Sequence, residues 1–310
     1  MKVLFISRSK KGNPSIITYN QGESLKIEGL SVEYFLIEGG GFSGYLRYIK
    51  ILKRFIHANP FDVFHAHYSL SGIIAALSGC RPLVVSLMGS DVKERKGYRL
   101  IIKCFNYFFW NACIVKTQDM KTSLKTNNVH ILPNGVDLSV FKILEKNKCK
   151  KLLNIDQQKK VILFLADPNR KEKNYPLAAK SVSLINRRDI TLLPVYQVSS
   201  LEIPYYLNAA ELLILTSAWE GSVNVVKEAM ACNLPIVSTD VGDVKKNISG
   251  IDGCYITTND PMDIKEKIEM ALNYNQRTSG RKKIISLGLD SKSVAQKLIH
   301  IYKSVLRYDN

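Results

Sequence analysis

The chain has 310 residues and carries 44 Lys and Arg against 27 Asp and Glu, a net charge of +17. Its 46% hydrophobic and 23% charged content is typical of a soluble globular protein. No apolar run reaches the ~18 residues of a membrane span, and the opening MKVLFIS lacks the length and cleavage site of a signal peptide. The six cysteines form no C-x-x-C pairs, which argues against a disulfide framework or a zinc site, so we expect a cytoplasmic protein.

Short apolar runs alternate with helical stretches along the whole chain. The first half contains KVLFIS, VEYFLI, DVFHAHY, PLVVSL, ACIVKT and VHILP, and the second VILFLA, TLLPVYQV, ELLILTS, LPIVST and CYITT. Runs rich in Val, Ile and Leu that stay apolar on consecutive residues are typical of parallel strands covered on both faces. The sequence therefore predicts an α/β protein with two doubly wound parallel sheets.

A polar, Lys-rich stretch at 142–160 separates the two sets of runs and is expected to be a linker. We therefore expect Rossmann-like domains at 1–145 and 146–290, followed by a last helix at 291–310 that must dock on the rest of the chain. The apolar stripe of this helix is formed by Val294, Leu298, Ile301 and Val305. Two such domains would face a central cleft, where ligands bind at the carboxyl ends of the strands.

Positive charge is concentrated in the first half. Residues 1–150 hold 22 Lys and Arg against 10 Asp and Glu, a net +12, whereas residues 151–310 hold 22 against 17, a net +5. Such a charge suits nucleic acid, an anionic membrane surface or a phosphorylated ligand, and charge alone does not choose among them.

Gly39, Gly41 and Gly44 fit the G-x-G-x-x-G pattern of dinucleotide-binding loops. That fingerprint also needs an acid about 20 residues further on, at the end of the next strand, to bind the ribose hydroxyls. The only acid at that distance is Asp62, which stands before its apolar run and would lie at the opposite edge of the sheet. We therefore interpret the stretch as a glycine loop without a dinucleotide.

The stretch after this loop is amphipathic and basic. Its apolar positions follow helical spacing at Tyr45, Tyr48, Ile49, Leu52, Phe55 and Ile56, and Arg47, Lys50, Lys53 and Arg54 surround them. A core-facing helix and a membrane-surface helix both explain this pattern. The positive charge of this half favours the membrane.

The most informative segment follows the apolar run ELLILTS and reads AWEGSVNVVKEAMACNLPIVSTDVG. Glu220 lies in the turn and Glu228 two turns into a helix whose buried stripe is Val225, Val226, Ala229 and Met230. The N–H groups of residues 222–225 could hold phosphate oxygens, and a carboxylate accepts hydrogen bonds from vicinal sugar hydroxyls. This pairing suits a nucleotide-sugar. Alternatively, Glu220 complements the helix dipole and Glu228 is a solvated acid.

The run from Glu220 to Gly242 resembles the E-x7-E signature of family 4 glycosyltransferases, which have the GT-B fold. Asn233 stands where the family usually has glycine, and Asn tolerates the left-handed conformation of such a helix end. The segments PNGVD at 133–137, RKEKNYPLA, FDVFHAHYSLSG and PLVVSLMGSDV also resemble family segments. The resemblance covers nearly the whole chain.

The resemblance implies a retaining glycosyltransferase that moves a sugar from a nucleoside-diphosphate sugar to an acceptor hydroxyl. It implies bacterial surface polysaccharide or glycolipid assembly, with a glycan or lipid-linked acceptor and without an obligatory metal or cofactor. The enzyme would be cytoplasmic, with a peripheral place on the inner face of the membrane. A GT-B sugar-nucleotide epimerase or hydrolase and a basic nucleic-acid-binding protein are the alternatives.

The family's donor-site residues can be transferred to this sequence. Lys173 would bind the donor diphosphate, Glu220 the transferred sugar and Glu228 the ribose. Pro168 occupies the place of the family's arginine, so Arg170 is expected to substitute for it. The full predicted donor site is Arg170, Lys173, Glu220, Gly221, Ser222, Val223, Asn224, Val225 and Glu228.

In this family the N-domain binds the acceptor. Met88 stands where the family often has a histidine, and a thioether cannot carry a proton. His65 and His67 are the nearest candidates for a polar role, with His67 as a catalytic candidate beside Glu220 and Lys173. The predicted acceptor side consists of Gly12, Asn13, His65, His67 and Asp91.

Overall fold

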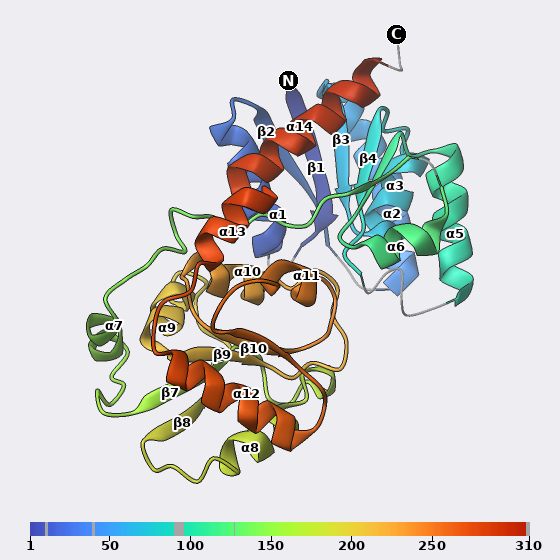
Figure 1. Ribbon diagram of the computed structural model, residues 1–310. Coiled ribbons are helices and arrows are strands. Elements are labelled where there is room, and N and C mark those ends of the chain that lie inside the picture. The colour runs from blue at the N-terminus through green and yellow to red at the C-terminus, as the bar shows by residue number, and fades with distance from the viewer. Residues whose placement is uncertain (10–11, 39–40, 90–95, 127, 308–310) are drawn as a thin grey trace. The chain divides into compact units, whose positions relative to one another are not determined.

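The computed structural model describes residues 1–9, 12–38, 41–89, 96–126 and 128–307. The chain forms two compact units (Figure 1). Unit 1 comprises Met1–Gly135 together with Ser291–Asn310, and unit 2 comprises Val136–Asp290. All eleven predicted apolar runs contain a strand, and all pairings between described strands are parallel. The predicted α/β class is therefore confirmed.

Unit 1 contains a six-stranded sheet. In sheet order its strands are β2 (Ser31–Ile37), β1 (Lys2–Arg8), β3 (Val63–His67), β4 (Leu83–Ser86), β5 (Ala112–Val115) and β6 (Val129–Ile131). Side chains alternate between the faces, so Val3 and Phe5 enter one buried cluster, whereas Leu4 and Ile6 enter another. Apolar residues at consecutive positions are needed because both faces are covered.

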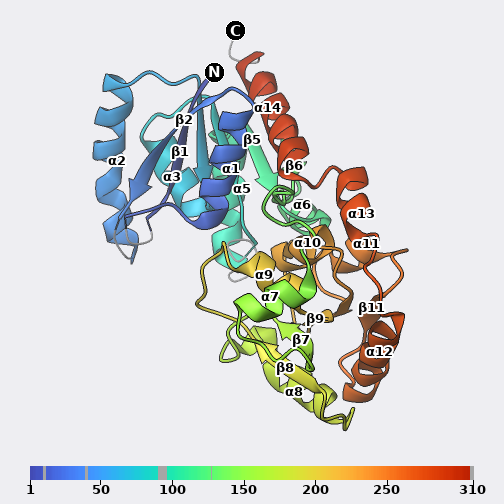
Figure 2. The same cartoon turned by 90° about the vertical axis from the view of Figure 1, so that its left-hand side faces the viewer.

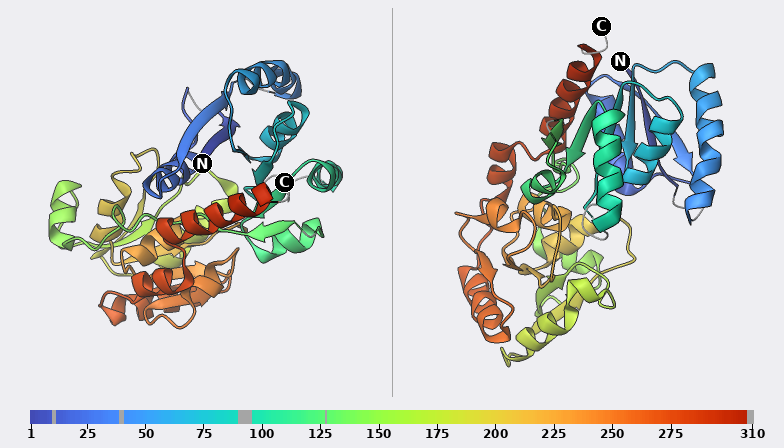
Figure 3. Two further views of the ribbon diagram at one scale, coloured as in Figure 1. Left: turned by 90° about the horizontal axis from the view of Figure 1, so that it is seen from above. Right: turned by 90° about the vertical axis from the view of Figure 1, so that its right-hand side faces the viewer.

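Two layers of helices cover this sheet. Helices α1 (Ile16–Ile27) and α14 (Ser291–Arg307) run side by side on the face of Val3 and Phe5 (Figure 2). Helices α2 (Gly41–Ala58), α3 (Ser69–Leu77) and α5 (Lys96–Phe108) lie on the other face (Figure 3), and α6 (Gln118–Leu124) precedes β6. The last helix therefore docks on unit 1, and its predicted stripe is buried there.

The amphipathic helix α2 faces the core of unit 1 with its apolar side. Tyr45, Tyr48 and Leu52 are buried there. The sequence left open whether the apolar side of α2 faces the core or a membrane, and the structure shows that it faces the core. The basic residues of α2 remain exposed.

Asp62 lies directly before β3, as the glycine-loop argument required. Its carboxylate accepts a hydrogen bond from the backbone N–H of Lys2 at 2.6 Å. Lys2 begins β1, so Asp62 serves the amino edge of the sheet. Gly39 of the glycine motif lies outside the described residues.

Unit 2 contains a five-stranded sheet. In sheet order its strands are β11 (Cys254–Thr257), β10 (Ile236–Thr239), β9 (Leu212–Leu215), β7 (Lys160–Phe164) and β8 (Ile190–Pro194). One face packs on α9 (Ile203–Ala209), α10 (Asn224–Ala231), α11 (Val244–Ile248) and α13 (Gly280–Leu287). The other face packs on α8 (Tyr175–Ser183) and α12 (Pro261–Tyr274). The short helix η1 (Lys171–Lys173) lies between β7 and α8.

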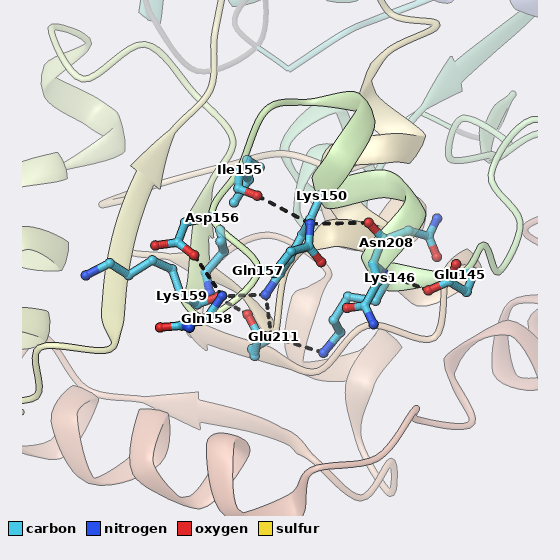
Figure 4. Close-up of polar contacts among 12 residues, drawn as sticks. Glu145, Lys146, Lys150, Ile155, Asp156, Gln157, Gln158, Lys159, Asn208 and Glu211 are labelled. Atoms are coloured by element: carbon cyan, nitrogen blue, oxygen red, sulfur yellow. Dashed lines mark hydrogen bonds and ion pairs between the residues drawn. The ribbon is translucent and has the colours of Figure 1, made fainter.

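The stretch predicted as a linker instead contains a helix, α7 (Lys146–Leu152), which packs on α9. Figure 4 shows the polar contacts that hold it: Lys146 and Lys150 both pair with Glu211, at 3.1 and 3.5 Å. Lys150 also donates to the carbonyl of Lys159 at 2.6 Å. The lysines that suggested a solvated linker are thus partly structural. The units divide after Gly135, within the PNGVD segment, rather than after 145.

Two smaller expectations are also met. Asn233, the second residue after α10, has a left-handed backbone with φ 54°, and all six cysteines are free. Among the described residues, no helix is long and apolar enough to cross a membrane.

Candidate functional site

The E-x7-E segment begins directly after β9 and continues into α10. Glu220 and Lys173 form an ion pair, and both side chains are largely buried, with 17% and 13% exposed. Ser217 donates a second hydrogen bond to the same carboxylate oxygen of Glu220 at 2.9 Å. Lys173 follows β7 and Glu220 follows β9, which are neighbouring strands. The carboxyl ends of parallel strands therefore bring two predicted donor residues together.

The loop that carries Lys173 is bonded to the loop after β9. The Thr216 hydroxyl donates to the carbonyls of Lys173, at 3.1 Å, and Asn174, at 3.0 Å. The N–H of Ala218 donates to the carbonyl of Glu172 at 2.9 Å. These bonds fix the backbone on both sides of the ion pair.

Arg170 is engaged elsewhere. Its Nε and Nη2 atoms donate to one carboxylate oxygen of Glu172 at 2.8 and 2.5 Å, and its side chain is 56% exposed. A backbone hydrogen bond and Arg170 lower the pKa of Glu172. To bind a diphosphate, Arg170 would first have to leave Glu172.

Glu228 has an unusual environment for an acid. It lies on the second turn of α10, and its carboxylate has no hydrogen-bond partner among the residues that the structure describes. Burial raises the pKa of Glu228 to about 7, although the neighbouring Lys227 opposes this shift. Its hydrogen-bonding capacity remains available for a ligand.

Asp243, which the sequence analysis missed, organises the start of α10. Its carboxylate accepts from the N–H of Val223 at 3.1 Å and from the Ser222 hydroxyl at 2.7 Å. The Val223 N–H, predicted to hold donor phosphate, therefore already has an acceptor in this structure. A usable signal was present, because Asp243 follows β10, the strand beside β9.

Lys227 is a buried cation under the same turn. Its side chain is 1% exposed, and its ammonium donates to the Ser222 hydroxyl at 3.0 Å. Burial lowers the pKa of Lys227 to about 8, while Asp243 and Glu228 favour the charged form. The hydrogen bonds from Lys227 to Ser222 and from Ser222 to Asp243 therefore stabilise the turn that carries Glu220.

Gly242 is required by a close approach of two loops. A Cβ at this position would lie 1.8 Å from the carbonyl oxygen of Gly221, and the backbone φ is +58°. Both observations exclude an unstrained side chain here. Loops from neighbouring strands β9 and β10 thus contact each other next to Glu220.

The two histidines of unit 1 have different environments. His65 is fully buried, with Nδ1 2.6 Å from the Tyr302 hydroxyl and Nε2 2.8 Å from the Ser86 hydroxyl. His67 stacks on His65 with ring centroids 4.3 Å apart, and neither of its ring nitrogens has a hydrogen-bond partner in the described part of the chain. Burial and the nearby Lys116 lower the pKa of His67 to about 3. His65 is thus structurally engaged, whereas His67 is neutral and available.

His67 lines a cavity of about 560 Å³ in unit 1. Among the described residues, the lining consists of Ser7, Arg8, Ser15, Thr18, Tyr45, His67, Tyr68, Leu70 and Met88. Ser7 and Arg8 end β1, His67 ends β3 and Met88 follows β4, which are neighbouring strands. Gly12 and Asn13 are not part of this lining, and Asp91 lies outside the described residues. The N–H of Gly12 donates to the Ser9 hydroxyl at 2.9 Å.

Two family models match this chain. Residues 9–140 match "Glycosyltransferase Family 4" and residues 194–274 match "Glycosyl transferases group 1". The two matches fall in unit 1, apart from residues 136–140, and in unit 2, respectively.

Relatives with related descriptions are found in bacteria. TuaC of Bacillus subtilis (strain 168), a glycosyltransferase named for teichuronic acid biosynthesis, is 29% identical over 59% of this chain and 54% of its own length. This alignment thus spans about half of TuaC. The UDP-Gal:alpha-D-GlcNAc-diphosphoundecaprenol alpha-1,3-galactosyltransferase of Escherichia coli is 22% identical over 84% of this chain and 75% of its own length.

Solved structures share the architecture at low sequence identity. Sucrose-phosphate synthase from Thermosynechococcus elongatus has a TM-score of 0.82 at 14% identity and covers 99% of both chains. Anabaena HepE in complex with UDP has a TM-score of 0.77 at 17% identity, over 98% of this chain and 100% of its own. At such identities the likeness establishes the fold. The likeness identifies the architecture as GT-B. The matched family models, one in each unit, show that the chain belongs to the family 4 glycosyltransferases.

Proposed function

We propose that this protein transfers a sugar from a nucleoside-diphosphate sugar to an acceptor hydroxyl with retention of anomeric configuration. The observation that carries the proposal is the set of groups gathered after β7, β9 and at α10: the Lys173–Glu220 ion pair and the unpartnered carboxylate of Glu228. HepE is described with UDP and with UDP-glucose, and the E. coli relative uses UDP-Gal. A UDP-sugar is therefore our proposed donor.

Each of the three groups has a distinct task. Lys173 binds the diphosphate, because an ammonium has three N–H donors and can contact a phosphate oxygen while keeping Glu220. Glu220 binds hydroxyls of the transferred sugar. The two carboxylate oxygens of Glu228 accept hydrogen bonds from the two ribose hydroxyls. The Ser222–Asp243 contact holds the intervening turn in place.

The chemistry follows from the charge that develops during transfer. The bond from the anomeric carbon to the diphosphate oxygen breaks, the bond to the acceptor oxygen forms on the same face, and the acceptor proton passes to the leaving diphosphate. The sugar gains oxocarbenium character while negative charge grows on the diphosphate. Lys173 stabilises that charge. The proposal includes no obligatory metal or cofactor.

We further propose surface-polysaccharide assembly with a lipid-linked acceptor, as the descriptions of TuaC and the E. coli galactosyltransferase suggest. Unit 1 would then lie against the inner face of the cytoplasmic membrane. Helix α5 contributes an exposed apolar side. Its exposed large residues lie on one side of the helix: Leu100, Ile101, Tyr107 and Phe108, with 71%, 46%, 76% and 63% exposed.

Helices α2 and α5 cover the same face of the sheet, with α3 between them (Figure 3). The exposed basic residues of α2 are Arg47, Lys50, Lys53 and Arg54. Cations near an anionic bilayer contribute about 1 kcal/mol each, and apolar residues on an interfacial helix bury into the headgroup region. This face therefore combines both kinds of membrane contact.

The test of transfer compares UDP-sugar consumption with and without a lipid-diphosphate sugar acceptor. A transferase consumes the donor in step with acceptor conversion. Donor isomerised or hydrolysed equally without acceptor would support the epimerase or hydrolase alternative. Binding to DNA or RNA that falls steeply with salt and competes with UDP would favour the nucleic-acid alternative.

The membrane placement is tested by co-sedimentation with vesicles containing anionic lipid. We expect Leu100→Ser with Phe108→Ser, and separately Lys50→Glu with Arg54→Glu, to release the protein. Leu201→Ser in unit 2, also 71% exposed, is the matched control and should sediment like the wild type. Wild-type protein that stays in the supernatant at low salt would contradict the placement.

A further inference from the structure

The charged side chain in the described lining of the unit 1 cavity is a cation, Arg8. The cavity combines hydroxyl groups, a neutral imidazole and one guanidinium with two apolar side chains, and its described lining includes no Asp or Glu. Sites for neutral sugars often use carboxylates as hydrogen-bond acceptors. This lining instead favours a ligand that brings negative charge.

Two buried residues of the lining have unused hydrogen-bonding groups. The Ser7 hydroxyl and both ring nitrogens of His67 are almost wholly shielded from solvent and have no partner in the described structure, and the residues are only 3% exposed. A buried polar group without a hydrogen-bond partner destabilises the folded protein. Such groups are therefore expected to receive partners from a ligand or from water that the ligand displaces.

The positive end of the cavity is formed by two elements. Arg8 ends β1 and has no carboxylate partner within the described residues. The twelve-residue helix α1 begins at the same cavity, because Ser15, its N-cap, and Thr18, in its first turn, belong to the lining. A helix N-terminus carries partial positive charge, so both elements attract an anion.

We propose that this cavity binds an oxyanion of the acceptor, with Arg8 as its counter-ion and Ser7 and His67 as hydrogen-bond partners. The ligand is a phosphate ester or a sugar carboxylate, which share this chemistry. The proposal rests on the proposed function, since it names the class of acceptor: an anionic sugar or sugar phosphate rather than a neutral glycan.

The neutral state of His67 is compatible with this assignment. With a pKa of about 3, the ring carries no charge at neutral pH, so it offers one N–H donor and one acceptor nitrogen. The donor can face the oxyanion and the acceptor a sugar hydroxyl beside it. Charge recognition then falls to Arg8, which makes Arg8 the residue to test.

The experiment measures binding of three soluble probes by calorimetry: a hexose 1-phosphate, a hexuronic acid and a methyl hexoside. Saturating UDP is present throughout, so that the donor site, including Lys173, is occupied. For the wild type, we expect one or both anionic probes to bind at least about tenfold more tightly than the neutral one, as a charge-assisted hydrogen bond would give. The relative affinities of the anionic probes distinguish phosphate from carboxylate.

Arg8→Gln should remove this preference, and Arg8→Lys should restore part of it. Arg188→Gln, which removes an exposed arginine in unit 2, is the matched control and should bind like the wild type. His67→Phe keeps the ring size and should weaken both anionic and neutral probes. Unchanged melting temperatures establish that each variant folds.

Equal affinity of the wild type for all three probes, or an unchanged preference in Arg8→Gln, would overturn the proposal. Neither result would affect the proposed function, which is judged by donor consumption. If the anionic probes bind through Arg8 but no acceptor supports transfer, the oxyanion site stands and the transferase assignment fails.

Discussion

Replacing Glu228 by Gln should stabilise the ligand-free protein at pH 8 while weakening nucleoside binding. In the folded state burial raises the pKa of Glu228 from 4.5 to about 7. Below pH 4.5 the carboxyl is protonated in both folded and unfolded chains and has no effect. As pH rises from 4.5 to 7, the unfolded chain releases the proton while the folded chain retains it, so stability falls with pH.

The magnitude follows from this difference. A shift from 4.5 to about 7 corresponds to roughly 3 kcal/mol, and the partial exposure of the side chain reduces it, so we expect about 1–3 kcal/mol. Gln keeps the shape and cannot ionise. Its advantage over Glu in free energy of unfolding should be near zero at pH 4.5, grow up to pH 7 and then level off.

The assay is urea-induced unfolding of both proteins across this pH range, with calorimetric titration of uridine in parallel. Well below pH 7, the affinity of the wild type for uridine should fall about tenfold with each unit by which the pH is lowered. The reason is that only the ionised carboxylate of Glu228 accepts both ribose hydrogen bonds. Glu228→Gln should bind weakly and without this pH dependence. A stability difference that is independent of pH, or equal uridine affinity in both proteins, would refute the reasoning.

Three further predictions concern Lys173, Glu220 and the loop contact at Gly242. Lys173→Ala should raise the dissociation constant of UDP far more than that of uridine, because the diphosphate is the only part of UDP that its ammonium contacts. Equal losses of affinity for both ligands in calorimetry would contradict this role. Glu220→Gln should lower the turnover number sharply while UDP affinity barely changes, and near-normal transfer would remove Glu220 from the sugar site. Gly242→Ala should lower the melting temperature and weaken UDP binding, because its Cβ would lie 1.8 Å from the Gly221 carbonyl oxygen; an unchanged melting temperature would show that the two loops separate easily.

The strands were predictable from the sequence because their chemistry is local. A buried parallel strand needs apolar side chains on both faces, so runs such as VILFLA and ELLILTS indicate it without tertiary information. The left-handed residue at Asn233 was predictable for the same reason, since the helix end alone requires it.

Contacts between distant segments were not predictable in this way. Lys146 and Lys150 suggested a solvated linker, and only their shared partner Glu211, about 60 residues away, places α7 on unit 2. Likewise, periodicity could not show that Lys227 is buried, because its partner Ser222 is positioned by the loop after β10.

The difference between His65 and His67 also depended on the fold. Both stand in FDVFHAHY, two residues apart on the same side of the strand, and the sequence offered both as candidates for a polar role. Tyr302 of α14 accounts for one of them, and this helix lies 237 residues further along the chain. The cavity beside His67 needs the ends of β1 and β3 together with α1, so no single motif indicated it.

The central claim is most directly tested by the configuration of the product. The protein would be incubated with a UDP-sugar of α configuration and a lipid-diphosphate sugar acceptor, and the new linkage read by proton NMR from the coupling at the anomeric position. Retention by the Lys173–Glu220 site predicts an α-linked product, with acceptor conversion equal to UDP release. A β-linked product, or UDP released with free sugar and no new linkage, would contradict the account.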